Sequence, residues 1–211
     1  MGLAELKNAF PFPANAPDVP PFDHGWFWEC HKELLSGAMG SHVKVILELG
    51  SWLGKSTQWL AEQSPNATII AVDHWQGSAE HLEKPEWRAL LPTLYETFIK
   101  NCWEFRDRII PLRMNTISGM GFVNQFGVNP ELIFIDAGHD YASAYGDVSN
   151  ALRLFPSAAI CGDDFYWEGV NKAVTEHVKH GIMLASYKDN QWWKENNVFT
   201  HIHGARQVPG K

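Results

Sequence analysis

The stretch "LELGSWLGKSTQWL" at residues 47–60 decides the fold, because it carries an apolar run straight into a helical pattern. The run leading into it, "VKVILELG", is typical of a strand covered on both faces, and "KSTQWLAEQS" has the spacing of a helix. Gly50 and Gly54 let the backbone of the turn approach a ligand closely, and a helix start offers N–H groups that lack helical partners. The stretch therefore predicts a strand, a ligand-binding turn and a helix.

The same alternation of strand and helix patterns continues along the chain. It favours a mainly parallel sheet with helices on both faces. Pro111 lacks the N–H that a central strand needs, so its strand is placed at an edge. The predicted fold class is α/β: a Rossmann-like, doubly wound, mainly parallel seven-stranded sheet with a terminal antiparallel hairpin and an N-terminal helical cap. The predicted strands are residues 43–50, 67–73, 108–114, 131–138 and 157–164, the helices 55–64, 85–105, 117–127, 143–155 and 167–181, the long loop 74–84 and the hairpin 182–195.

The N-terminal segment has a different composition from the rest of the chain. Residues 10–25, "FPFPANAPDVPPFDHG", are too rich in proline to be regular, and "WFWECHKELLSG" after them has the pattern of a short helix. We therefore expect residues 1–42 to form a cap or lid segment on a single domain at residues 43–211.

Composition narrows the function classes. The net charge of -7 argues against non-specific nucleic-acid binding, which needs clustered Lys and Arg. No apolar run approaches the roughly 18 to 20 residues that span a bilayer, and the N-terminus lacks the pattern of an export signal. The three cysteines are widely spaced and form no disulfide framework. We expect a soluble, cytoplasmic protein that acts on a small molecule, with neither nucleic acid nor membrane as its partner.

Two acidic residues flank the predicted ligand-binding turn. A pyrophosphate site would prefer the spacing G-x-G-x-x-G, whereas "GSWLG" departs from it and Glu48 stands two residues before Gly50. A carboxylate repels an anion and attracts an ammonium or sulfonium group. Asp73 ends the second strand, where an acid can accept hydrogen bonds from ribose hydroxyls. A nucleoside with a cationic tail suits both acids.

A second acidic group follows the next two strands. "IFIDAGHDY" at residues 133–141 contains Asp136 and His139, and "ICGDDF" at residues 160–165 contains Asp163 and Asp164. Each acid alone is a candidate helix cap, but caps do not require two adjacent acids on one strand and a third on its neighbour. Clustered carboxylates raise one another's pKa unless a cation neutralises them, and oxygen ligands favour Mg²⁺. We therefore expect Asp136, Asp163 and Asp164 to bind a divalent metal.

The turn and its acids resemble the class I S-adenosylmethionine-dependent methyltransferases over roughly residues 43–190. "ELGSWLG" is similar to the first motif of that superfamily and "AVDHW" to its second, although the first departs from the commoner acidic-x-G-x-G-x-G form. "RMNT" resembles the segment that borders adenine. The resemblance implies S-adenosylmethionine as cofactor. The cofactor-binding residues that it implies are Glu48, Gly50, Ser51, Gly54, Ser56, Asp73, Asn115, Thr116 and Asp136.

The pattern D-x-x-H followed some 27 residues later by D-D resembles the metal-dependent sugar O-methyltransferases of the macrocin and mycinamicin type. That resemblance implies metal ligation by Asp136, Asp163 and Asp164 and a general-base role for His139. The family usually has paired glycines before the fifth strand, whereas this chain has "PSAAICGDD".

The sequence thus favours an S-adenosylmethionine-dependent, metal-assisted O-methyltransferase whose acceptor is a small-molecule hydroxyl on a sugar or other vicinal diol. Two alternatives stay open. A nicotinamide-dependent oxidoreductase would explain the sheet and Asp73, and a non-catalytic adenosyl-binding module would explain the turn. The aromatic residues proposed to contact the substrate are Trp26, Trp75, Tyr141 and Trp167.

Overall fold

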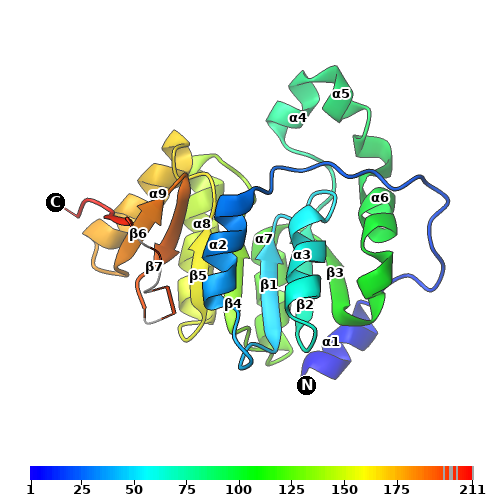
Figure 1. Ribbon diagram of the computed structural model, residues 1–211, viewed down its shortest axis with the longest axis horizontal. Helices are drawn as coiled ribbons and strands as arrows, with labels where there is room; N and C mark the ends of the chain where they lie inside the picture. The colour runs from blue at the N-terminus through cyan, green and yellow to red at the C-terminus, as the bar shows by residue number, and fades with distance from the viewer. Residues whose placement is uncertain (197, 200–201, 203, 211) are drawn as a thin grey trace.

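The computed structural model describes residues 1–196, 198–199, 202 and 204–210, so residue 211, the predicted end of the domain, lies outside it. The strands in these residues form one sheet in the order β3-β2-β1-β4-β5-β7-β6-β8 (Figure 1). β3, β2, β1, β4 and β5 pair parallel with one another, and β7, β6 and β8 each pair antiparallel with the strand before them in this order. The doubly wound, mainly parallel fold is confirmed. The strands are β1 (Val45–Leu49), β2 (Thr68–Asp73), β3 (Ile109–Arg113), β4 (Leu132–Ile135), β5 (Ala159–Gly162), β6 (Ala185–Lys188), β7 (Gln191–Lys194) and β8 (Arg206–Gln207).

Helices cover both faces because alternate strand residues point to opposite sides. All five residues of β1 are buried: Leu47 packs with one helical layer and Ile46 with the other. The first layer contains α1 (Leu3–Ala9), α7 (Thr116–Gln125), α8 (Tyr141–Leu154) and α9 (Glu168–Lys179), and the second α2 (Glu29–Ala38), α3 (Lys55–Gln63) and α6 (Leu94–Asn101). β3, which contains Pro111, is the edge strand that the sequence predicts.

The region between β2 and β3 differs from the prediction. The loop at residues 74–84 contains the short helix α4 (Ala79–Glu83), and the single helix expected at residues 85–105 is broken. Pro92 explains the break, because a proline in a helix interior removes an N–H donor and clashes with the carbonyl four residues earlier. The pieces are α5 (Pro85–Arg88), the 3₁₀ turn η1 (Leu91–Thr93), α6 and the 3₁₀ turn η2 (Trp103–Arg108).

The terminal hairpin forms as predicted across Asp189 and Asn190, both of which have positive φ, 50° and 72°. Asn and Asp tolerate that conformation, which two-residue hairpin loops require. The sheet gains an eighth strand, because β8 pairs with β6 through Arg206 and Gln207. The predicted number of seven is therefore wrong by one: a two-residue strand carries too little pattern to be recognised.

The N-terminal cap runs from α1 through an irregular strap to α2 (Figure 1). The strap, residues 10–28, crosses the edge of the sheet at which the parallel strands end. Its Trp26 contacts aromatic rings of the turn after β1, of α4 and of α5. The α1 helix has no counterpart in the prediction. No helix in the described part of the chain is long and apolar enough to cross a membrane.

Candidate active site

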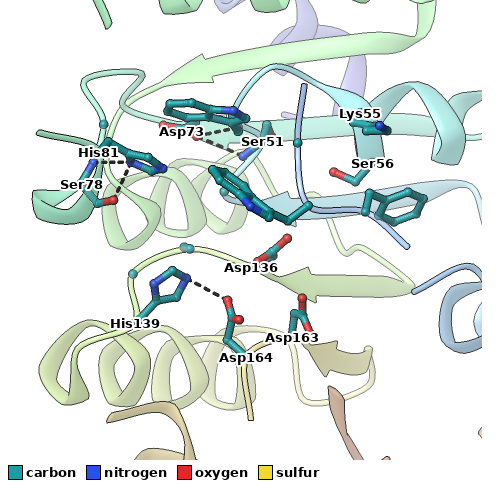
Figure 2. Close-up of a pocket in the computed structure, with 18 of the residues that line it drawn as sticks. Ser51, Lys55, Ser56, Asp73, Ser78, His81, Asp136, His139, Asp163 and Asp164 are labelled. Carbon is teal, nitrogen blue, oxygen red and sulfur yellow. Dashed lines mark hydrogen bonds and ion pairs between the residues drawn. The ribbon is translucent and has the colours of Figure 1, made fainter. Parts of the chain in front are cut away.

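A cavity of about 710 Å³ lies at the carboxyl ends of the parallel strands. Figure 2 shows Asp73 and Ser51 on one side of it, His139, Asp163 and Asp164 on the other, and Asp136 between them. This is the edge at which doubly wound sheets bind ligands. The predicted site residues that line the cavity are Gly50, Ser51, Ser56, Asp73, Asn115, Thr116, Asp136, His139, Asp163, Asp164, Trp26 and Trp167.

The turn after β1 depends on its two glycines. Gly50 has φ +88°, and a Cβ there would lie 1.9 Å from the carbonyl oxygen of Asp136. Gly54 has φ +83° and begins α3, and a Cβ there would lie 2.5 Å from Cys102 Sγ. The first glycine therefore lets β1 and β4 end side by side, and the second lets α3 start against α6. Gly54 itself lies behind the cavity wall.

Asp73 holds the same turn from the end of β2. Its Oδ2 accepts the backbone N–H groups of Ser51 and Trp52 at 3.1 and 2.9 Å, and its Oδ1 accepts that of Trp75 at 2.7 Å. An ionised carboxylate can accept about four hydrogen bonds. Asp73 therefore organises the turn, and its Oδ1 retains acceptor capacity beyond this one hydrogen bond. Asp73 also lines the cavity.

Glu48 lies beneath the turn and is fully buried. Its Oε2 accepts hydrogen bonds from Ser51 Oγ at 2.6 Å and Thr57 Oγ1 at 2.5 Å, so it fastens the turn to α3. Burial raises the pKa of Glu48, and hydrogen bonds from Ser51, Ser56 and Thr57 oppose that rise. Glu48 supports the cavity floor from behind and does not line the cavity.

Asn115 and Thr116 follow β3 and line the cavity. Asn115 caps α7 by accepting the N–H of Ser118 at 2.8 Å, and Thr116 Oγ1 donates to Asp147 Oδ1 at 2.5 Å. Asp147 is a cavity residue that the sequence analysis missed, because it occurs in the middle of a helical pattern. Burial raises its pKa from 3.8 to about 6.

The Asp147→Asn substitution is expected to stabilise the protein at pH 8 by up to about 3 kcal/mol, since one pKa unit corresponds to about 1.4 kcal/mol. A pKa that folding raises favours the folded state fully below pH 3.8, and this contribution is lost as the pH rises through about 6. Asparagine is neutral and can still accept from Thr116. Urea unfolding at pH 4 and pH 8 measures the effect, and an equal gain at both pH values would contradict it.

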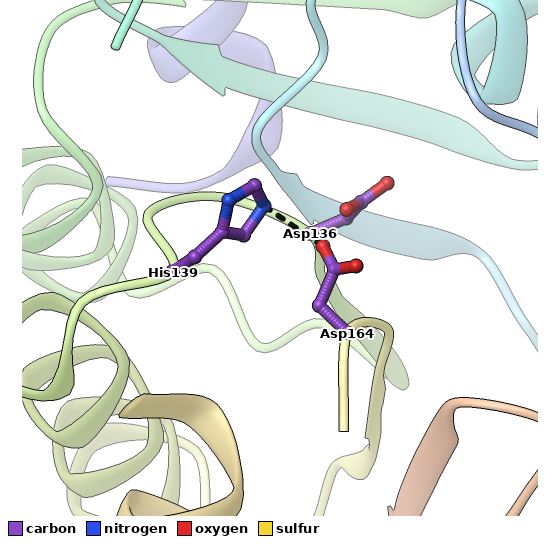
Figure 3. A group of neighbouring side chains, drawn as sticks. All are labelled: Asp136, His139 and Asp164. Carbon is purple, nitrogen blue, oxygen red and sulfur yellow. Dashed lines mark ion pairs between the residues drawn. The ribbon is translucent and has the colours of Figure 1, made fainter. Parts of the chain in front are cut away.

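A group of three titratable side chains lies on the opposite side of the cavity. Asp136, His139 and Asp164 each offer one ligand atom, and these atoms lie within 4.8 Å of one another (Figure 3). His139 Nε2 lies 2.8 Å from Asp164 Oδ2. Burial, together with Asp163, Asp164 and Glu48, holds the pKa of Asp136 well above its usual range. A cation at this group would relieve the repulsion among the carboxylates.

Asp164 is held in place by the hairpin turn. It has φ +61°, which costs a non-glycine residue about 1 to 3 kcal/mol and persists only where surrounding contacts enforce it. Those contacts come from Asn190: its Nδ2 donates to Asp164 Oδ1 at 3.3 Å, and its carbonyl and amide oxygens accept the N–H groups of Phe165 and Tyr166. The antiparallel hairpin therefore aims Asp164 at the cavity.

Asp163, the third predicted metal ligand, points to a different partner. Its Oδ2 lies 2.6 Å from Nε2 of His31, a buried residue of α2 that the sequence analysis missed. The four predicted residues do converge at one mouth, but the described group within 4.8 Å has His139 in place of Asp163. Metal binding by Asp163 remains a prediction.

The four aromatic substrate candidates divide into two pairs. Trp26 and Trp167 line the cavity, and Trp167 stacks on His139 at 4.5 Å between ring centroids. The other two have different surroundings: Trp75 is buried and packs on Tyr95 and Phe98, and the Tyr141 hydroxyl donates to Glu176. Neither lines the cavity.

Further aromatic residues surround Trp26. Trp52 and His81 stack at 4.2 Å with an interplanar angle of 15°, and Trp87 meets Trp26 edge to face at 5.0 Å. Trp52 Nε1 also donates to His24 of the strap at 3.3 Å. These contacts attach the strap to the turn after β1 and to the helices after β2.

The strand order, the glycine turn after β1 and the acid that ends β2 are those of a Rossmann-like α/β protein, and the cavity lies at the edge where such folds bind ligands. The family model described as a methyltransferase domain matches residues 47–165. That is more than half of the chain, and the chain belongs to this methyltransferase family.

The chain is also similar to a curated protein in sequence and to solved structures in fold. An 80-residue segment is 31% identical to the uncharacterized phycocyanin operon protein W of Pseudanabaena tenuis (strain PCC 7409), covering 36% of this chain and 76% of that protein. Among solved structures, an O-methyltransferase from Bacillus cereus in complex with SAH has a TM-score of 0.52 at 19% identity, covering 92% of this chain and 88% of that one. The TDP-rhamnose 3′-O-methyltransferase of calicheamicin biosynthesis has a TM-score of 0.53 at 13% identity, covering 79% and 77%. At these identities the structures support the fold alone.

Proposed function

We propose that this protein is an S-adenosylmethionine-dependent O-methyltransferase that methylates a small-molecule hydroxyl with the help of a divalent cation. The observation that carries the proposal is that one cavity is lined both by Asp73 and by the group of Asp136, His139 and Asp164. Membership of the methyltransferase family supports the reaction class.

The residues on the Asp73 side fit S-adenosylmethionine. Gly50 brings bare backbone to the cavity, and Asp73 Oδ1 retains acceptor capacity suited to a ribose hydroxyl. Asp73 and Asp136 line this part of the cavity with carboxyl groups, whose oxygens suit a sulfonium better than an anionic cofactor. S-adenosylmethionine, when bound, supplies an electrophilic methyl group.

The residues on the opposite side fit a divalent cation such as Mg²⁺. Two carboxylates from neighbouring strands approach each other, and the pKa of Asp136 is held high by burial and by its acidic neighbours. Mg²⁺ prefers oxygen ligands, so we assign it to Asp136 and Asp164, with Asp163 as the third carboxylate. The cation, when bound, lowers the pKa of the acceptor hydroxyl.

The chain itself then positions the acceptor and moves one proton. His139 Nε2–H donates to Asp164 Oδ2 at 2.8 Å, so in the neutral ring Nδ1 is the nitrogen that takes the hydroxyl proton, and Asp164 stabilises the imidazolium that forms. Trp167 stacked on the ring keeps it in that orientation. The oxygen of the acceptor must approach the methyl group in line, so much of the rate enhancement comes from positioning.

The cavity limits the acceptor to a small molecule, because about 710 Å³ must hold both cofactor and acceptor. Its acidic lining disfavours an anionic acceptor, and Trp26 and Trp167 offer flat faces to a ring. A sugar or another vicinal diol suits these walls. A nicotinamide-dependent oxidoreductase would leave Asp136, His139 and Asp164 without a task, and so would a non-catalytic adenosyl-binding module.

S-adenosylmethionine or its demethylated product is expected to raise the melting temperature, as any ligand of the native state does, whereas NAD is not. Asp73→Ala should abolish most of that shift, because Asp73 organises the turn and faces the cavity. Differential scanning fluorimetry measures both effects. Asp18→Ala, which removes an exposed carboxylate that does not line the cavity, is the matched control. A larger shift with NAD than with the adenosyl compounds would sink the proposal.

A further inference from the structure

His31 joins the N-terminal cap to the catalytic side of the cavity. It stands in the first turn of α2, is 1% exposed, and its Nε2 lies 2.6 Å from Asp163 Oδ2. The ring lies between Phe27 and Phe134, with centroid separations of 5.1 and 6.4 Å. A buried histidine against a buried carboxylate is costly unless the hydrogen bonds are well formed.

The second ring nitrogen fixes the direction of that bond. His31 Nδ1 accepts the backbone N–H of Trp28 at 2.9 Å, so Nδ1 carries a lone pair. In a neutral imidazole the other nitrogen then carries the hydrogen. His31 Nε2–H therefore donates to Asp163 Oδ2, and the start of α2 orients the donor.

Asp163 is oriented from a second direction by its strand. Its backbone N–H donates to the carbonyl of Ile135 at 3.1 Å, which places it directly after β5 and beside Asp136. Figure 2 shows Asp163 next to Asp164 and below Asp136. The hydrogen bond from His31 to Oδ2 fixes the rotation of the Asp163 carboxylate, so Oδ1 is the oxygen that remains to bind a cation.

We propose that His31 is a positioning residue that holds Asp163 in the orientation from which it binds the cation, so that the N-terminal cap completes the metal site. This inference rests on the proposed function. Partners of this kind, which bond a metal ligand and not the metal, typically contribute 10- to 100-fold to metal affinity.

Two substitutions separate the two nitrogens of His31. In His31→Gln, the side-chain amide nitrogen reaches the place of Nε2 and can still donate to Asp163, whereas the acceptor for Trp28 is lost. In His31→Asn, the amide oxygen takes the place of Nδ1 and can still accept from Trp28, whereas the donor to Asp163 is lost. The pair therefore distinguishes positioning of Asp163 from capping of α2.

Titration calorimetry with Mg²⁺, without cofactor or acceptor, is the readout, and thermal unfolding is recorded in parallel. His31→Asn is expected to weaken Mg²⁺ binding at least 10-fold, and His31→Gln to keep it within about 3-fold of native although it loses a helix cap. A purely structural role would lower the melting temperature of the variants without this difference in affinity.

Three results would overturn the inference. Mg²⁺ binding that is unchanged in both variants, or equally weakened in both, would overturn the role of His31 and leave the proposed function standing. Tighter binding in His31→Asn would mean that His31 withholds Asp163 from the cation. A native protein that takes up no Mg²⁺ would overturn it together with the cation part of the proposed function, while the thermal shift with S-adenosylmethionine still tests the remainder.

Discussion

Replacement of His139 by alanine is expected to lower turnover by roughly 10² to 10⁴, the usual contribution of a positioned proton transfer. Asp73 and Ser51, which we propose to bind the cofactor, lie across the cavity from His139, so the thermal shift with S-adenosylmethionine should stay close to native. Mg²⁺ affinity should also change little, because the two carboxylates remain. Single-turnover rates with a labelled methyl group measure the loss, which should lie in the chemical step.

Two controls separate proton transfer from packing in this experiment. His139→Phe keeps a ring to stack on Trp167 but has no proton acceptor, so it should lose as much turnover as the alanine variant. Added imidazole should restore part of the rate in His139→Ala and none in His139→Phe. Turnover should also fall in acid, where a protonated imidazole accepts no proton. Native turnover in His139→Ala would mean that another group is the base. Asp140, the acid next to His139, would then be the candidate, although it already caps α8 by accepting the N–H groups of Ala142 and Ser143.

The parts of the fold that the sequence predicts are those governed by local patterns. β1 is buried along its whole length and has a continuous apolar run, and the two-residue turn Asp189–Asn190 has residue types that accept positive φ. The single helix expected at residues 85–105 is wrong, because the apolar spacing continues across Pro92 although the proline ring interrupts the helical backbone there.

The site is predictable only where chain position determines location. Asp73 ends a parallel strand and Asp136 and Asp164 follow two others, and the carboxyl ends of such strands meet at one edge. His31 lies 132 residues from Asp163 and has no pattern of its own, so only the docking of α2 brings the two together. Trp75 follows the second strand, as a binding residue could, but packing against α6 buries it.

Gly50→Ala is expected to cost about 4 kcal/mol or more in the free energy of unfolding, the largest stability effect that we predict. Positive φ alone costs a non-glycine residue about 1 to 3 kcal/mol. The added Cβ would also lie 1.9 Å from the carbonyl oxygen of Asp136, and backbone cannot move aside as a flexible side chain does. The end of β1 is held on both sides, since Gly50 N–H donates to Val72 and Leu49 accepts from Asp136.

Gly181→Ala separates the clash from the conformational cost. Gly181 has φ +68° and follows α9, and a Cβ there meets nothing within 4 Å. It should therefore cost only about 1 to 2 kcal/mol. Urea unfolding of the two variants measures the difference in the free energy of unfolding. In thermal unfolding, the melting temperature of Gly50→Ala should be lower than that of Gly181→Ala by roughly 5 °C or more for a chain of this size. Equal losses would mean that β1 and β4 can separate at their ends. The turn after β1 would then be held by Asp73 and Glu48 without the close approach at Gly50.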